Sequence, residues 1–278
     1  MAKPEDVGVV DTLIGLPHVF EPGRDPHDTI GYMFKDLPSV ERTGSSIEEL
    51  LGEMDRFGIE RGLIPLYLDD ELAIRAVKEH PDRLMGSVAI DPNRGMGALD
   101  DLKRGVEELG ARAAQFMPAD LVPPVPINDK RAFPVYAKCV ELGVPVFVNG
   151  GVPGPGVPFD SQYPGHVDEV CWFFPDLKFV FRHGCEPWAD LTVKLLLKWP
   201  NLYYSTSGFA PKYYPKAIID FANTRGGDKV LYAGYYPYGL GLDRIFRELE
   251  NLPLRQEVWP KFLRTNALRV LGLAEVAE

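Results

Sequence analysis

The sequence has little cysteine, no long apolar run and no excess of basic residues, and each absence excludes a class of protein. The three cysteines are an odd number, and their spacing gives neither a disulfide framework nor a C-x-x-C pair. No apolar stretch reaches the ~20 residues of a membrane-spanning helix, and no signal-peptide pattern opens the sequence. The formal charge of −10 argues against nucleic acid or an anionic membrane as a partner. We therefore expect a cytoplasmic protein.

What the sequence does contain is a regular alternation of strand-like and helix-like segments. Short runs of apolar and β-favouring residues predict eight strands, over residues 7–12, 61–66, 85–90, 112–117, 144–148, 177–181, 202–205 and 229–232. Helical patterns lie between them, over residues 46–57, 70–80, 97–109, 129–142, 167–174, 188–199, 213–223 and 242–249. Such alternation implies parallel strands joined by right-handed crossovers. Eight units predict a (β/α)8 TIM barrel, formed by a single domain over residues 1–278.

Local signals refine this picture. Ser45 and Ser46 precede Glu48 and Glu49 in a capping-box-like arrangement. The Asn128-Asp129 pair is expected to begin the helix over residues 129–142, and Gly143 is expected to end it. A last helical pattern over residues 255–272 is expected to pack outside the barrel. Two long loops, 15–44 and 150–163, have the length of functional lids or partner surfaces.

The segment LKFVFRHGCEPW, residues 177–188, carries the first candidate for chemistry. Its apolar run predicts a buried strand that stops at Arg182, His183 and Gly184. The carboxyl ends of barrel strands are where the active sites of this fold lie. His183 is therefore a candidate general acid or base, or else a histidine hydrogen-bonded within the barrel mouth for structural reasons.

Five sequence segments together suggest a family. They are HPDRLMG (80–86), AIDP (89–92), ELGVPVF (141–147), FPDLKFVFRHG (174–184) and NALRVLG (266–272). In order and spacing they resemble the amidohydrolase-related family that includes the aminocarboxymuconate-semialdehyde decarboxylase-like enzymes. The resemblance implies a barrel of the metal-dependent hydrolase type that binds one divalent metal, commonly zinc, and that hydrolyses or decarboxylates small acids. It also places His183 at the family's acid–base position.

The same resemblance implies metal ligands at four strand-end positions, and the sequence departs from it at each. The first strand should end Asp-x-His-x-His, but Leu13 and Gly15 follow Asp11 where the histidines belong. Asn149 replaces the histidine after the fifth strand, and Tyr235 replaces the aspartate after the eighth. A divalent site needs about three converging N, O or S ligands. We therefore expect no metal cofactor.

Other polar residues could serve in a binding or catalytic site. Asp11 is a weaker candidate for a base, against a structural role in bonding the backbone. Asn149, Gln115 and Tyr235 could contact a polar ligand or simply fill a vacated site. Arg182 could pair with a substrate carboxylate or with a neighbouring acidic residue.

Two further possibilities involve the histidines and a cysteine. His18 and His27, in the first long loop, could join His183 and Cys185 in a replacement metal site, although their spacing fixes no geometry. Cys185 could instead be a thiolate nucleophile activated by imidazole. An inert cysteine is the plainer interpretation.

Three functions remain open at this stage. The first is a non-catalytic barrel that supports another chain in a homo- or hetero-oligomer, with a metal-bearing relative as a candidate partner. The second is a metal-independent hydrolase or decarboxylase that acts on a small carboxylic acid, with His183 as the acid–base group. The third is a protein that binds a small acid without turning it over.

Overall fold

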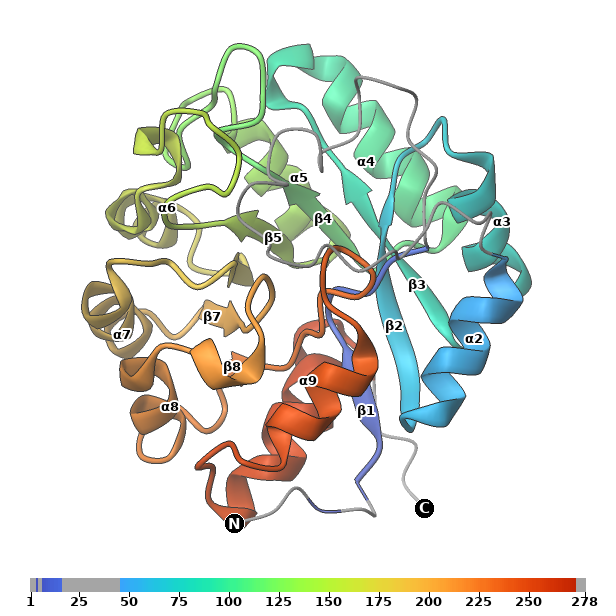
Figure 1. Cartoon of the computed structure of the whole chain (residues 1–278). Coiled ribbons are helices and arrows are strands. Elements are labelled where there is room, and N and C mark those ends of the chain that lie inside the picture. The colour runs from blue at the N-terminus through green and yellow to red at the C-terminus, as the bar shows by residue number, and fades with distance from the viewer. Residues whose placement is uncertain (1–3, 5–6, 17–45, 274–278) are drawn as a thin grey trace.

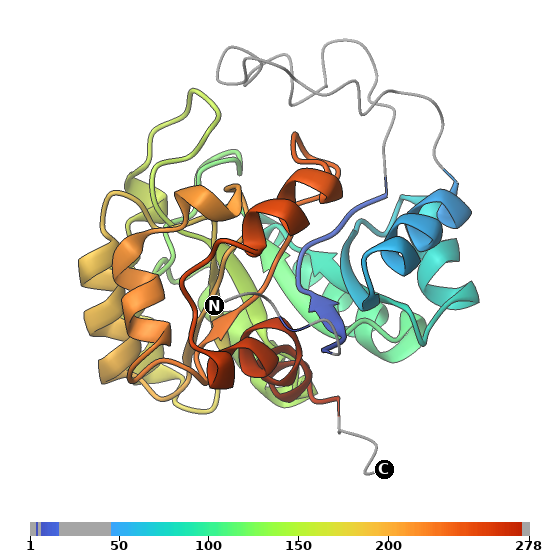
Figure 2. The same cartoon turned by 60° about the horizontal axis from the view of Figure 1, so that its bottom comes forward.

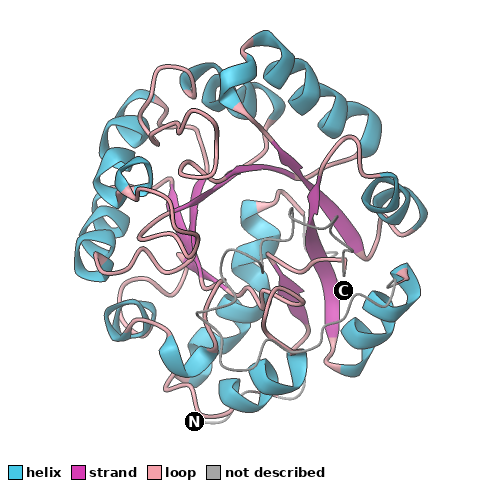
Figure 3. Ribbon diagram, turned by 45° about the horizontal axis from the view of Figure 1, so that its top comes forward, coloured by secondary structure: helices cyan, strands magenta, loops and turns pink. Residues whose placement is uncertain are grey.

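The computed structural model describes residues 4, 7–16 and 46–273. Its eight strands form one sheet in the order β1 to β8, and each neighbouring pair is parallel. The strands are β1 Val9–Asp11, β2 Ile59–Leu66, β3 Leu84–Ala89, β4 Ala113–Phe116, β5 Val146–Asn149, β6 Phe179–Arg182, β7 Leu202–Ser205 and β8 Val230–Leu231. The strands curve into a ring, with helices around the outside (Figures 1 and 3). The predicted (β/α)8 TIM barrel is confirmed.

A helix follows each strand, as the alternation of the sequence predicts. The helices are α2 Ile47–Arg56, α3 Glu71–Glu79, α4 Met96–Leu109, α5 Phe133–Leu142, α6 Val167–Phe173, α7 Ala189–Lys198, α8 Lys216–Ala222 and α9 Leu242–Leu249. Within the described residues, no helix is both long and apolar enough to cross a membrane. Of the first long loop, residues 17–44 lie outside the part of the chain that the structure describes.

The ring closes between the first and last strands through bonds just beyond the strand ends. The backbone N–H of Thr12 donates to the carbonyl of Tyr232 at 3.2 Å, and the N–H of Tyr235 donates to the carbonyl of Leu13 at 2.9 Å. The Thr12 hydroxyl also donates to Tyr232, at 2.8 Å. These bonds join segments more than 200 residues apart, and they fix the ends of β1 and β8 beside each other.

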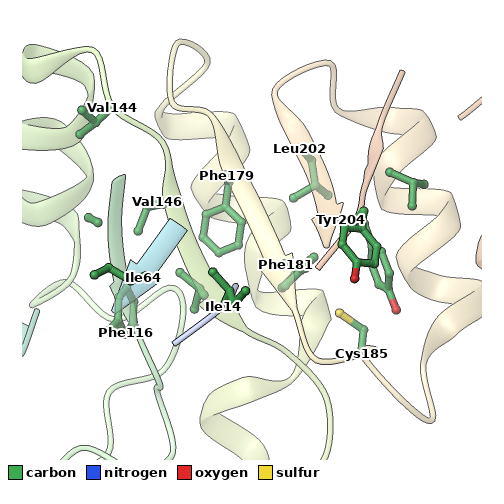
Figure 4. Close-up of a cluster of buried hydrophobic side chains, with 14 of the residues drawn as sticks. Ile14, Ile64, Phe116, Val144, Val146, Phe179, Phe181, Cys185, Leu202 and Tyr204 are labelled. Carbon is green, nitrogen blue, oxygen red and sulfur yellow. The ribbon is translucent and has the colours of Figure 1, made fainter. Parts of the chain in front are cut away.

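Two apolar clusters lie on opposite faces of the strands. Side chains such as Phe179, Phe181 and Tyr204 face the surrounding helices, and Figure 4 shows part of this outer cluster. The alternate positions face the barrel interior, because successive side chains of a strand point to opposite faces. This inner cluster contains Val10, Leu63, Met85, Ala113, Phe147, Val180 and Leu231.

The C-terminal segment is helical, as predicted, but it packs against the inward side chains of the strands and not around the outside of the barrel. The segment consists of a 3-10 turn, η6 Gln256–Val258, a π-helical turn, η7 Lys261–Thr265, and a short helix, α10 Asn266–Val270. Ala267, Leu268, Val270 and Leu271 belong to the inner cluster. The reason is that the inward side chains of the strands are apolar and need a cover at the amino ends of the strands. The C-terminal segment supplies that cover and lies beneath the ring (Figure 2).

Polar contacts hold this segment in place. The Lys178 ammonium, just before β6, donates to the carbonyl of Val270 at 3.1 Å. The Asn266 side chain donates to the carbonyl of Val230 in β8 at 2.8 Å. The C-terminal segment is therefore bonded to β8 and to the residue that precedes β6, which is separated from β8 by β7 alone.

Two of the three predicted helix ends are confirmed. Ser46 and Glu49 form a reciprocal capping box at the start of α2, and Gly143 ends α5 in the left-handed conformation, with φ 70°. The predicted start of α5 is wrong by several residues. The Asp129 carboxylate accepts from the N–H of Arg131 at 2.8 Å, so this residue closes a local turn and the helix begins only after it.

Candidate functional site

The barrel interior changes from apolar to polar toward the carboxyl ends of the strands. On four strands, the inner-cluster residue is followed two positions later by another inward-facing residue. These four residues are Thr12, Gln115, Asn149 and Arg182, and all four are buried. They form a polar layer above an apolar floor. The sequence predicted Gln115, Asn149 and Arg182 at this place.

Arg182 lies at the centre of this layer. One guanidinium nitrogen donates to the Gln115 side-chain oxygen, and another donates to the carbonyl of Thr12 at 3.2 Å. The guanidinium carbon is 4.7 Å from the centroid of the Phe147 ring. In the sheet, Arg182 is in register with Asn149. Four strands thus contribute to the surroundings of one cation.

The Arg182 cation is not neutralised by any carboxylate bonded to it in the described part of the chain. Its side chain is only 3% exposed, and its Nε has no hydrogen-bond partner there. Burial lowers the pKa of Arg182 to about 9, while the phenols of Tyr238 and Tyr67 and the carboxyl of Asp11 act in the opposite direction. The group is therefore still cationic at neutral pH. A buried cation with an unsatisfied donor favours the binding of an anion.

His183 lies immediately beyond Arg182. Its Nδ1 is 3.0 Å from the Ser207 hydroxyl, and its ring meets the Tyr235 ring edge-on, with centroids 5.0 Å apart. Burial, and then the charge of Arg182, lower the pKa of His183 to about 3. The imidazole is therefore neutral at pH 7 in the free protein.

The backbone around His183 is strained. His183, Gly184 and Cys185 are consecutive residues with φ of 63°, 83° and 55°, and Tyr235 across the mouth has φ 64°. Left-handed conformations cost non-glycine residues about 1–3 kcal/mol each and concentrate at functional sites. Here the strain places the His183 and Tyr235 rings against each other.

Tyrosine rings fill the positions that the resemblance assigns to metal ligands. A Cβ on Gly15 would lie 2.1 Å from the Tyr238 hydroxyl oxygen, so the phenol occupies the space of a side chain at this position. The Tyr235 and Tyr238 rings are themselves 5.3 Å apart. Tyr67, at the end of β2, remains 53% exposed. The mouth is thus lined by phenols around the guanidinium.

Asp11 is not brought into this layer. It alternates with Thr12 and faces away from the interior, and its carboxylate accepts from the backbone N–H groups of Leu13 and Gly234, both at 2.9 Å. Burial raises its pKa to about 7, against the lowering effect of these bonds and of Arg182. These contacts are those expected of an Asp11 that bonds the backbone for structural reasons.

Within the described part of the chain, Cys185 is not assembled with other candidate ligands into a second site. Cys185 is fully buried, and burial raises the pKa of its thiol, which argues against a thiolate nucleophile. His18 and His27 lie outside the described residues. Among the residues that are described, no group of three or more His, Cys, Asp or Glu side chains could hold a metal ion.

Sequence reasoning missed Ser207 and Thr12. Ser207 follows the end of β7 and contacts a residue 24 positions earlier. Thr12 contacts Arg182 through its backbone carbonyl, and the type of side chain at a position does not predict such a contact.

Comparison with known proteins places this geometry in context. A family model described as Amidohydrolase matches residues 19–273, whereas no curated protein matches the sequence. An uncharacterised TIM-barrel protein from Bordetella bronchiseptica is 24% identical, with a TM-score of 0.80 over 96% of this chain and 99% of that one. A 2,6-dihydroxybenzoate decarboxylase in complex with 2,6-dihydroxybenzoate is 18% identical, with a TM-score of 0.71 over 96% and 100%.

A third similar structure corrects the prediction that no metal cofactor is involved. It is a 5-carboxyvanillate decarboxylase from Novosphingobium aromaticivorans with bound manganese, 16% identical, with a TM-score of 0.67 over 96% of this chain and 98% of that one. Barrels of this fold therefore do hold a divalent metal. In the described part of this chain, however, Leu13, Gly15, Asn149 and Tyr235 do not supply the imidazole and carboxylate ligands of such a site.

Proposed function

Since this chain belongs to the amidohydrolase family, we propose that it is a carboxy-lyase that removes CO2 from a small carboxylic acid bound in the barrel mouth. The observation that carries the proposal is Arg182, a buried cation in the polar layer with an unpartnered Nε. The decarboxylases among the similar structures support the same reaction class. Together they favour this predicted alternative over a non-catalytic supporting subunit.

The first step is binding of the substrate anion. Arg182 presents a donor that no described residue satisfies, and an incoming carboxylate or other oxyanion would supply both an acceptor and the missing negative charge. Gln115 and the Thr12 carbonyl hold the guanidinium through its other nitrogens. The guanidinium group of Arg182 is therefore oriented before the substrate arrives, which reduces the entropic cost of ordering it on binding.

The second step is replacement of CO2 by a proton. The carbon–carboxylate bond breaks, its electron pair stays on the carbon, and a proton from His183 completes the C–H bond. A bound anion offsets the charge of Arg182, which is one cause of the low pKa of His183. Anion binding therefore raises that pKa and lets the imidazole take up a proton beside the reacting carbon. A positioned acid of this kind contributes about 10²–10⁴-fold to a rate.

The test is release of CO2 from 2,6-dihydroxybenzoate and from 5-carboxyvanillate, in buffer that contains Mn²⁺. We expect turnover of a small acid by the wild-type protein and a loss of at least about 100-fold in kcat/KM for Arg182→Gln and for His183→Asn. Arg75→Gln, on the exposed face of α3, is the matched control and should retain the wild-type rate.

Two results would contradict the proposal. One is turnover that survives in Arg182→Gln. The other is saturable binding of small acids by the wild-type protein with no CO2 released from any member of a broad panel, which would establish the small-acid binding function instead.

A further inference from the structure

The Ser207 hydroxyl makes two contacts with the same residue. It accepts the backbone N–H of His183 at 3.3 Å, and it lies 3.0 Å from Nδ1 of the His183 ring. Ser207 is fully buried. A single oxygen atom therefore fixes both the backbone and the ring of the candidate acid–base residue.

The two contacts decide where the protons lie. A backbone N–H can only donate, so one lone pair of the Ser207 oxygen accepts from it. The Ser207 hydroxyl proton is then available for donation to Nδ1, which lies 3.0 Å away. A nitrogen of neutral imidazole that accepts carries no proton, and the other nitrogen must carry it.

Close packing holds the ring in this orientation. Gly208 has φ +88°, and a Cβ on it would lie 2.8 Å from Nδ1 of His183. The Nδ1 edge of the ring is thus pressed against Ser207 and Gly208, where no side chain fits. The Nε2 edge is on the opposite side of the ring from this contact.

We propose that Ser207 is a positioning residue that holds His183 as a neutral imidazole protonated on Nε2, so that an N–H donor faces the barrel mouth. His183 directly follows Arg182 in the sequence. An oxyanion in the mouth therefore accepts a hydrogen bond from the Nε2–H of His183 and is attracted by the positive charge of Arg182. In the free protein, before an anion binds, the lowering of the His183 pKa by burial keeps this neutral form present at pH 7. Neutral imidazoles act in this way as electrophilic donors in other barrel enzymes. The inference refines the role of His183 in the proposed function.

The test is ¹⁵N NMR of the whole protein labelled in its five histidines, with His183→Asn to assign the signals. We expect an unprotonated, pyridine-like Nδ1 and a protonated, pyrrole-like Nε2 for His183, unchanged between pH 5 and pH 8. Ser207→Ala should mix the tautomers or reverse them, and Ser207→Thr, which keeps the hydroxyl, should restore the wild-type signals.

Ser205→Ala is the matched control. Ser205 is also fully buried at the end of β7, but its hydroxyl pairs with Thr12 at 3.0 Å, so its loss should leave the His183 signals in place. A wild-type His183 protonated on Nδ1, or a tautomer unaffected by Ser207→Ala in a folded protein, would overturn the proposal. Because the measurement needs no substrate, its outcome is independent of whether the protein is a carboxy-lyase.

In an active protein, Ser207→Ala should also lower kcat for CO2 release by about 10–100-fold, as loss of a group that orients a reacting one does. KM should change less, because Ser207 touches His183 and not the acid. Loss through KM alone would instead indicate a structural role in the shape of the mouth.

Discussion

At the scale of single residues, burial sets the ionisation of the mouth. Arg182 keeps its charge although it is almost inaccessible, His183 loses its charge, and Asp11 has a pKa of about 7. Each shift has desolvation as its largest cause, and desolvation always disfavours the charged form. The stability of the fold must therefore depend on pH near neutrality, with a sign that differs from residue to residue.

The pKa of Asp11 leads to a measurable pH dependence. The folded protein retains this proton up to about pH 7, whereas the unfolded chain loses it near pH 4. The contribution of Asp11 to stability is therefore present at low pH and is lost as the pH rises through that range. Asp11→Asn, which keeps the accepting oxygen but cannot ionise, should gain about 2 kcal/mol in unfolding free energy relative to wild type between pH 5 and pH 8.

Urea denaturation at several pH values measures this difference. Asp176→Asn, at an exposed position, is the control and should leave the pH profile unchanged. His183 acts with the opposite sign, because a lowered pKa makes stability fall as the pH decreases from 6.5 toward 3. An unfolding free energy for Asp11→Asn that tracks wild type at every pH would show that Asp11 does not retain its proton.

Strand-end position identified some members of the site but could not identify all of them. Arg182 and Asn149 directly follow predicted strands and Gln115 lies near the end of one, and parallel strands bring such ends together. Ser207 and Tyr238 act through contacts that depend on the path of a loop after the strand. No periodicity encodes that path, so sequence reasoning had no means of pairing Ser207 with His183.

At the scale of elements, the C-terminal segment shows where pattern and structure diverge. Strand and helix positions followed from hydrophobic periodicity, because each barrel helix has one apolar face and the strands are apolar on both. The same periodicity cannot say which apolar surface a last helix will cover. The apolar surface outside the barrel and the apolar interior were both available to a last helix, and α10 covers the interior.

The cost of removing one side chain from that floor can be measured. Leu268→Ala should lower the unfolding free energy by about 3 kcal/mol, since Leu268 is 4% exposed and belongs to the inner cluster. Leu197→Ala on α7, where the side chain is 37% exposed, should cost under about 1 kcal/mol. Equal losses in the two variants, measured by chemical denaturation, would mean that the segment does not contribute to the barrel core.

At the scale of the whole molecule, the two ends of the barrel differ in polarity. The inner cluster and α10 close the amino ends of the strands, and the polar layer lies toward the carboxyl ends. A ligand that reaches Arg182 from the mouth binds the folded chain alone, because the layer does not exist in the unfolded one. Its binding must then shift the folding equilibrium.

Benzoate is a suitable probe of this linkage. At a concentration of 100 times its Kd it should stabilise the protein by about 2.7 kcal/mol, which corresponds to a rise of about 5–10 °C in Tm for a chain of this size. Benzyl alcohol, which lacks the carboxylate, should have no effect. A benzoate shift that persists in Arg182→Gln would place the anion somewhere other than the polar layer.

The position of α10 also bears on how the protein is made. Synthesis proceeds from the N-terminus, and domains complete their folding as segments emerge. The inner cluster takes Val10 from the first strand and Leu268 from the last described helix, so residues from both must have been synthesised before its packing is complete. Folding of the barrel core therefore depends on contacts between segments more than 250 residues apart in the sequence.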